Sequence, residues 1–186
     1  MTAAGIQARG DHPLNNITGT IDGVAIRQEK PSYMGGTYPS HYRNRKGFFL
    51  LIVKAVCDYN YEFPLMCCRT PDYIQDATEL AFSDICERLQ NRKHPNILQL
   101  ISESLCIAAD DAYGDGELLQ TPWPGGGRWK TWRDAYDLSQ SSARMHIEQA
   151  FGQLDLLGGA LWRPMRMPFA KRPLMGKVAF FLHSVC

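Results

Sequence analysis

Four acidic residues stand where the expected elements of this sequence begin, end or pack together. Asp22 lies within or beside an expected strand, and Asp76 opens an expected helix. Asp110 directly follows an apolar strand, and Glu148 lies among apolar residues of a second helix. Hydrolysis of a phosphodiester requires charge to be stabilised on the attacking and leaving oxygens, which two divalent ions about 3.5–4 Å apart provide. Because Mg²⁺ prefers hard oxygen ligands, these carboxylates predict a site for Mg²⁺ or Mn²⁺.

Each acid taken alone also has an ordinary structural explanation. An aspartate before a glycine, as at Asp22, is common in turns, and the helix dipole favours an acid at the position of Asp76. Asp110 could belong to a solvated acidic loop. Glu148 could pair with Arg144, which lies four residues earlier on the same expected helix. Spacing alone therefore leaves the catalytic and the structural interpretations open.

The elements that must position these acids are strands in the first part of the chain. Ile17 to Ile26 alternates apolar and small residues and predicts a strand. Gly47 to Cys57 is an almost continuous apolar run, typical of a strand buried on both faces. Tyr61 to Cys68 follows after a turn signal as a third strand. These three strands predict an antiparallel meander.

Helical spacing of apolar residues begins after Pro71. It predicts helices over Ile74 to Gln90 and Ser139 to Leu157, with a short strand over Ser104 to Ala109 between them. The apolar segment Lys177 to Val185 fits either a helix or a strand. Strands followed by helix, strand and helix indicate an α/β fold, in which a mixed sheet is flanked by helices.

The local motifs resemble those of one family. In order along the chain they are Ile21-Asp22-Gly23, Asn44-Arg45-Lys46-Gly47-Phe48, Val56-Cys57-Asp58, Arg69-Thr70-Pro71 with Asp76, Asp110-Asp111-Ala112-Tyr113, Ile147-Glu148-Gln149-Ala150-Phe151-Gly152 and Leu182-His183-Ser184-Val185-Cys186. This series resembles the PIF/Harbinger-type DDE transposases and the harbinger transposase-derived nucleases. The resemblance runs from about Ile17 to Cys186.

The resemblance implies an RNase H-like fold, an antiparallel meander joined by a parallel strand and flanked by helices. It implies a catalytic triad of Asp22, Asp110 and Glu148, with Asp76 as a further metal ligand. The reaction expected is metal-dependent cleavage of DNA, with water or a DNA 3′ hydroxyl as the nucleophile. A nuclear location follows from the same resemblance.

The chain also departs from the family pattern. Gln75 and Ala77 flank Asp76 where the family has histidine and serine, Ala109 replaces a glycine, and Gln149 replaces a basic residue. We expect residues 1–16 to be a leader and residues 17–186 to be the nuclease domain, with no room for the family's N-terminal helix-turn-helix region. A separate DNA-binding protein would then supply targeting, and oligomerisation is left open. The alternative is a catalytically retired domain that binds DNA or protein.

Binding to DNA must rely on local basic segments, because the formal net charge is only +1. Two such segments lie within Arg27 to Lys54 and Trp162 to Lys177, and ordinary solvated loops are the alternative interpretation. The residues expected to contact DNA are Arg43, Arg45, Lys46, Arg144, Arg163 and Arg166. Three tryptophans around a glycine triplet could stack on bases or pack the loop down: Trp123, Trp129 and Trp132.

Cysteine usage and hydropathy narrow the class of protein. The six cysteines form no CxxC pair, and most lie in apolar runs, which indicates free buried thiols in a reducing compartment. The first 14 residues carry no apolar signal core, and no apolar stretch reaches the length of a membrane helix. We therefore expect an intracellular protein with no membrane partner.

Overall fold

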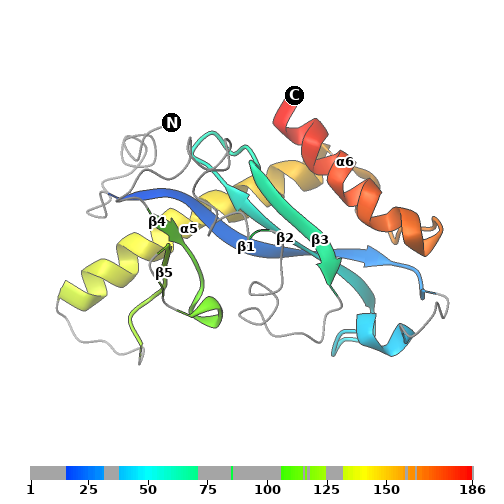
Figure 1. Cartoon of the computed structure of the whole chain (residues 1–186), viewed down its shortest axis with the longest axis horizontal. Coiled ribbons are helices and arrows are strands. Elements are labelled where there is room, and N and C mark those ends of the chain that lie inside the picture. Colours follow the sequence, from blue (N-terminus) through cyan, green and yellow to red (C-terminus); the bar gives the residue numbers. More distant parts are fainter. Residues whose placement is uncertain are drawn as a thin grey trace.

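A five-stranded mixed sheet forms the centre of the described structure (Figure 1). The computed structural model describes residues 16–31, 38–70, 85, 106–114, 116, 118–124, 132–157, 159–161 and 163–185. The strands lie in the order β3-β2-β1-β4-β5. Their bounds are Ile17–Gln28 (β1), Phe49–Cys57 (β2), Leu65–Thr70 (β3), Cys106–Ala108 (β4) and Leu119–Gln120 (β5).

Strand β1 joins an antiparallel half of the sheet to a parallel half. Strand β2 pairs antiparallel with both β1 and β3. On the other side, β4 runs parallel to β1, and β5 runs parallel to β4. This confirms the predicted antiparallel meander with an added parallel strand. With flanking helices, the order and directions are those of an RNase H-like α/β fold.

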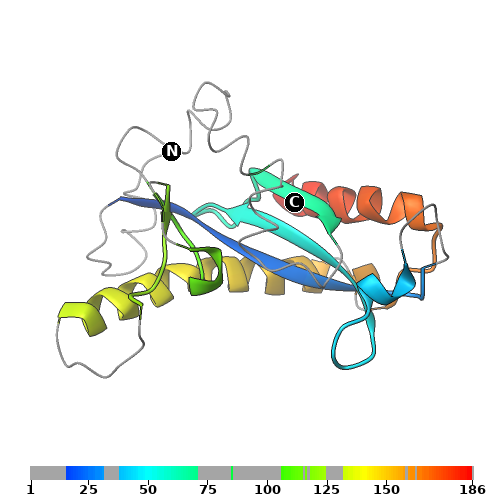
Figure 2. The same ribbon diagram turned by 60° about the horizontal axis from the view of Figure 1, so that its bottom comes forward.

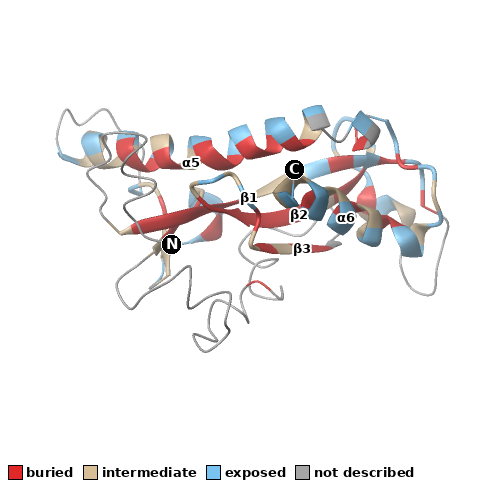
Figure 3. Ribbon diagram, turned by 90° about the horizontal axis from the view of Figure 1, so that it is seen from above, coloured by how far each residue is buried: buried red, intermediate tan, exposed pale blue. Residues whose placement is uncertain are grey.

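Two helices pack against one face of the sheet, α5 (Trp132–Leu157) and α6 (Arg172–Val185). Helix α5 runs along the sheet, with β4 and β5 near its first turns and α6 toward its other end (Figure 2). Its buried residues face the strands (Figure 3). The shared core includes Val53 and Ala55 of β2, Ile147 and Phe151 of α5, and Phe180 of α6. The described 3-10 helices are η1 (Pro39–Tyr42), η2 (Asp111–Tyr113), η3 (Gly159–Leu161) and η4 (Phe169–Lys171).

A second core cluster lies on the opposite face of the sheet. It contains Ile21, Val56, Leu65 and Ile107 from four strands, together with Ile85. Ile85 is helical and buried. The rest of the helix predicted over residues 74–90 lies outside the described residues. Strand β2 is therefore packed from both sides, as its continuous apolar run predicted.

Several boundaries differ from the sequence prediction. Helix α5 begins at Trp132, seven residues before the predicted start at Ser139, and α6 is helical from Arg172. Strand β3 begins at Leu65 rather than Tyr61, because the chain first turns at Asp58. The Asp58 carboxylate accepts hydrogen bonds from two backbone N–H groups of that turn, and Tyr61 has a positive φ of 67°.

Two further predictions concern cysteines and membrane helices. Cys57, Cys67 and Cys68 are free and buried, and Cys106 is free and half-buried, as predicted for this part of the chain. Cys86 and Cys186 lie outside the described residues, as do residues 1–15 of the expected leader. Across the described ranges, no helix has the length and apolar character needed to span a membrane.

Candidate metal centre

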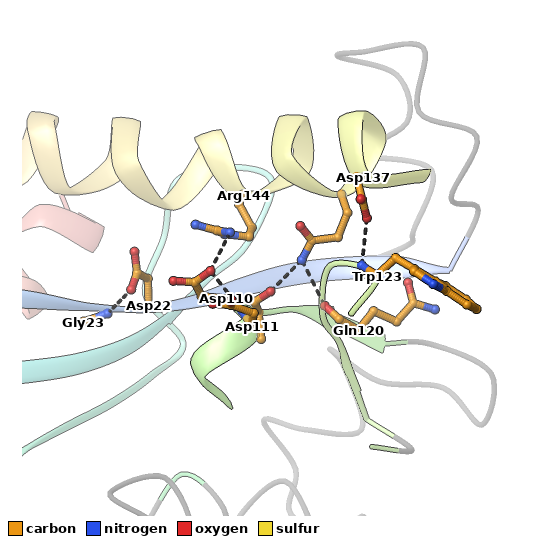
Figure 4. A network of polar contacts seen from close by, with 10 residues as sticks. Asp22, Gly23, Asp110, Asp111, Gln120, Trp123, Asp137 and Arg144 are labelled. Carbon is orange, nitrogen blue, oxygen red and sulfur yellow. Dashed lines mark hydrogen bonds and ion pairs between the residues drawn. The ribbon is translucent and has the colours of Figure 1, made fainter. Parts of the chain in front are cut away.

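Asp22 lies on β1 and Asp110 lies two residues beyond the end of the neighbouring parallel strand β4, and both face the same side of the sheet. Thr20 of β1 is in register with Ala108 of β4, and each acid follows its reference residue by two positions. Residues two apart on a strand share a face, so both carboxylates project toward α5 (Figure 4). The structure thus brings together two of the predicted acids, which come from positions 88 residues apart.

Hydrogen bonds to the Asp110 carboxylate and to the backbone carbonyl just before it fix the position of Asp110. Its carboxylate accepts the N–H of Asp111 at 2.9 Å and caps η2. The preceding carbonyl, that of Ala109, accepts a hydrogen bond of 2.6 Å from the side-chain amide of Gln140 on α5. The same amide nitrogen donates to the carbonyl of Gln120 on β5 at 3.1 Å (Figure 4). Gln140 is fully buried, so it ties the ends of β4 and β5 to α5.

Arg144 reaches from α5 to the carboxylate of Asp110. Its Nη1 lies 3.0 Å from Asp110 Oδ1, and the two side chains are 20% and 42% exposed. The helical spacing suggested instead a pair between Arg144 and Glu148, and that interpretation is wrong for Arg144. The pairing partner comes from a strand end that lies beside this part of the helix in space (Figure 4).

Asp22 lies in a partly desolvated and strongly charged environment. Burial raises the pKa of Asp22 above its ordinary value of 3.8. The hydrogen bond from the Gly23 N–H at 2.7 Å and the charges on Lys54 and Arg144 oppose this rise, whereas the charge on Asp110 adds to it. Both acids therefore share the field of Arg144.

Of the other two predicted acids, the structure describes Glu148 but not Asp76. Glu148 is exposed and lies one helical turn after Arg144, so the two side chains are neighbours on α5. Asp76 lies outside the described residues. Within the described residues, no three His, Cys, Asp or Glu side chains gather closely enough to hold a metal ion. The structure thus brings together Asp22 and Asp110, whereas Glu148 is exposed on α5 and is not gathered with them.

Two features of the pair bear on how it could hold a divalent cation. Carboxylate oxygens are the donors that Mg²⁺ and Mn²⁺ prefer. The Arg144 guanidinium already stands against Asp110 and, with Lys54, acts on Asp22, so a divalent cation would have to bind beside these side-chain cations or displace one of them.

Sequence reasoning gave Lys54 and Tyr113 no role in supporting this site. Lys54 of β2 is only 3% exposed, and its Nζ donates to the hydroxyl of Tyr113 at 2.9 Å. Tyr113 closes η2, directly after Asp110 and Asp111. A Cβ at Gly23 would lie 2.9 Å from Lys54 Nζ, so glycine leaves room for the lysine. A single lysine within the apolar run of β2 was the available signal.

The other predicted DNA-contacting residues gather at the Gln28 end of β1. They are Arg43, Arg45, Lys46, Arg163 and Arg166, which we name the basic end, and all five are exposed. Gln28 pairs with Phe49 at the start of β2 and with Met165. Asp22 and Gln28 are six residues apart on β1, or roughly 20 Å at about 3.3 Å per residue. The structure joins two basic segments that are distant in sequence, but away from the acids.

Aromatic and histidine side chains near α5 have mainly packing contacts. The rings of Trp123 and Trp132 meet edge to face at 5.1 Å, and Arg133 lies over both rings. His146 is buried and stacks on Tyr61. His183 lies 2.9 Å from the Tyr61 carbonyl, which agrees with a structural role. Trp129 lies outside the described residues.

Comparison with known proteins adds no relative to these observations. No protein-family model, no curated protein and no solved structure matches the chain. The resemblance of the motifs to Harbinger-type transposases stays a prediction, and the function is argued from the geometry of the acidic and basic residues.

Proposed function

We propose that this domain is a metal-dependent DNA endonuclease of the DDE type. The observation that carries the proposal is the placement of Asp22 on β1 beside Asp110, which follows the parallel strand β4, on the face covered by α5. Carboxylates held by the sheet in this way keep a fixed spacing, which a metal site requires. The motif resemblance gives the same acids the same role.

In this proposal Asp22 and Asp110 hold a divalent cation, and Glu148 adds a third carboxylate from α5. When bound, the metal stabilises charge on the attacking and leaving oxygens of the phosphodiester. The chain's own residues fix the carboxylates: Gln140 holds the carbonyl before Asp110, and Lys54 holds the loop after it through Tyr113.

Binding of DNA in this proposal uses the basic end. Arginine and lysine side chains neutralise phosphates and release counterions, so affinity falls steeply as salt rises. Arg166 also pairs with Glu29 at 3.0 Å, although both side chains are more than half exposed, so this pair is weakened by solvent. The exposed guanidinium groups are available to a phosphate backbone.

Cleavage of supercoiled plasmid DNA in Mg²⁺ or Mn²⁺ tests the proposal. We expect Asp22→Asn, Asp110→Asn and Glu148→Gln each to lower the rate by at least about 100-fold, as removal of charged groups at reacting centres commonly does. Asp111→Asn is the matched control, because Asp111 is an exposed acid adjacent to Asp110, and it should cut like the wild type. Equal cutting by the wild type and all three site variants would reject the proposal.

A second candidate function is a retired transposase domain that retains only binding. The ion pair of Arg144 with Asp110 favours it, because a side-chain cation neutralises part of the acidic site. Thermal unfolding with increasing Mn²⁺ separates the two functions, since a ligand that binds the native state stabilises it by RT ln(1 + [L]/Kd). Stabilisation that Asp22→Asn removes supports the nuclease, whereas an unchanged melting temperature supports the retired domain.

A further inference from the structure

Arg144 connects the helix to the carboxylate pair. It extends from α5, its Nη1 is 3.0 Å from Asp110 Oδ1, and only 20% of its side chain is exposed. Its charge also acts on Asp22, which faces the same side of the sheet. Arg144 therefore contacts Asp110 directly and, together with Lys54, acts on Asp22 through its charge (Figure 4).

Two carboxylates that project to the same side of the sheet in a half-buried position require a compensating cation. Like charges repel, and partial burial removes the water that would screen them. Arginine meets the requirement because it remains protonated at any ordinary pH. A divalent cation would meet the same requirement at the same carboxylates and would repel the guanidinium from them, so the guanidinium and the metal ion compete for this pair.

We propose that Arg144 is a built-in counter-ion that competes with the divalent metal, leaves Asp110 when the metal binds, and then binds a phosphate oxygen of the nucleic acid. This inference rests on the proposed nuclease function. The planar guanidinium suits the second role, because its N–H groups match the geometry of phosphate oxygens. Arg144 thus acts as a substrate-positioning residue that becomes available only in the metal-loaded protein.

A purely structural role makes a different prediction. If Arg144 only fastens α5 to the end of β4, its loss should loosen Asp110 and weaken metal binding. If it competes with the metal, its loss should strengthen metal binding while lowering the stability of the metal-free protein. The sign of the change in Mn²⁺ affinity therefore separates the two roles.

The experiment measures Mn²⁺ binding by isothermal titration calorimetry, and thermal unfolding with and without Mn²⁺. The variants are Arg144→Gln and Arg144→Lys, with Arg133→Gln as the matched control on the same helix, where Arg133 lies over the rings of Trp123 and Trp132. We expect Arg144→Gln to bind Mn²⁺ about tenfold more tightly, the scale of one charge-assisted hydrogen bond. Its metal-free melting temperature should fall, and Arg144→Lys should lie between it and the wild type.

A second titration follows binding of a short DNA duplex by fluorescence anisotropy. In Mn²⁺, Arg144→Gln should weaken DNA binding, whereas without metal it should leave that binding unchanged, because Arg144 is then held by Asp110. Arg133→Gln should match the wild type in its Mn²⁺ affinity.

The outcomes separate this inference from the nuclease proposal. If the wild type binds Mn²⁺ through Asp22 and Arg144→Gln binds it equally or more weakly, the inference is overturned and the nuclease proposal stands. If neither protein binds Mn²⁺, the nuclease proposal fails and the inference fails with it. Should Arg144→Gln unfold, Arg144→Lys decides: tighter Mn²⁺ binding than the wild type supports competition, and equal or weaker binding overturns it.

Discussion

Gln140 is the buried residue on which the position of Asp110 depends most directly. Replacement by methionine preserves much of the side-chain volume but removes the amide that donates to the carbonyls of Ala109 and Gln120 at 2.6 and 3.1 Å. The Ala109 carbonyl, buried and deprived of this donor, costs about 1–3 kcal/mol, and the bond lost at the Gln120 carbonyl, which keeps the N–H of Ala109 at 2.9 Å, costs about 0.5–1.5 kcal/mol. We therefore expect Gln140→Met to lower the free energy of unfolding by about 2–4 kcal/mol.

Urea denaturation followed by circular dichroism measures this effect. With an m-value of about 2 kcal/mol per molar urea, the unfolding midpoint should fall by about 1–2 M. Ser139→Ala is the control, because Ser139 is also buried but donates to the carbonyl of Ala135 within its own helix. That change should cost less than about 1 kcal/mol. A loss below about 0.5 kcal/mol for Gln140→Met would refute the view that the amide clamps β4 and β5 to α5.

Three further predictions follow from burial of charged and thiol groups. Because burial raises the pKa of Asp22, ionisation of Asp22 destabilises the native metal-free protein as pH rises through that pKa. Asp22→Asn should therefore have a higher melting temperature than the wild type at pH 7, and the difference should vanish below about pH 4. Thermal unfolding measured across this pH range tests the prediction. Asp58 accepts two backbone hydrogen bonds while only 2% exposed, so Asp58→Ala should cost about 2–4 kcal/mol in urea denaturation and Asp58→Asn clearly less. Burial raises the pKa of Cys68 to about 12 and also raises that of Cys57, so a thiol reagent at pH 8 should label both only after unfolding, and rapid labelling of the native protein would contradict their burial.

The fold was predictable where one local pattern decided an element. The continuous apolar run of β2 and the alternation of β1 are both found in the sheet, because burial on two faces or one imposes those patterns directly. Strand β5 could not be predicted, since two residues, Leu119 and Gln120, carry no periodicity. The start of α5 was missed because its first turns are largely polar, and their partners come from the segment just after β5, as in the hydrogen bond from Tyr136 to the carbonyl of Thr121.

The site was predictable in its residue types but not in its ion pairs. The sequence patterns placed Asp22 in a strand and Asp110 directly after one, and the parallel pairing of β1 with β4 brought the two acids to one face. Helical periodicity gave Arg144 the wrong partner, because spacing along one helix contains no information about which strand lies beneath it. The same limit hid Lys54, whose contact with Tyr113 joins residues 59 positions apart.

The separation of acids from the basic end decides which experiment distinguishes the two proposed functions. A distance of roughly 20 Å along β1 corresponds to about six phosphates of one DNA strand at about 3.4 Å each. DNA can therefore be held at the basic end by groups that make no contact with Asp22 or Asp110. Retention of DNA binding is expected of both a nuclease and a retired domain, whereas a metal response that depends on Asp22 is expected only of the nuclease. The function of this domain must therefore be tested at the carboxylate pair, and not at the basic end.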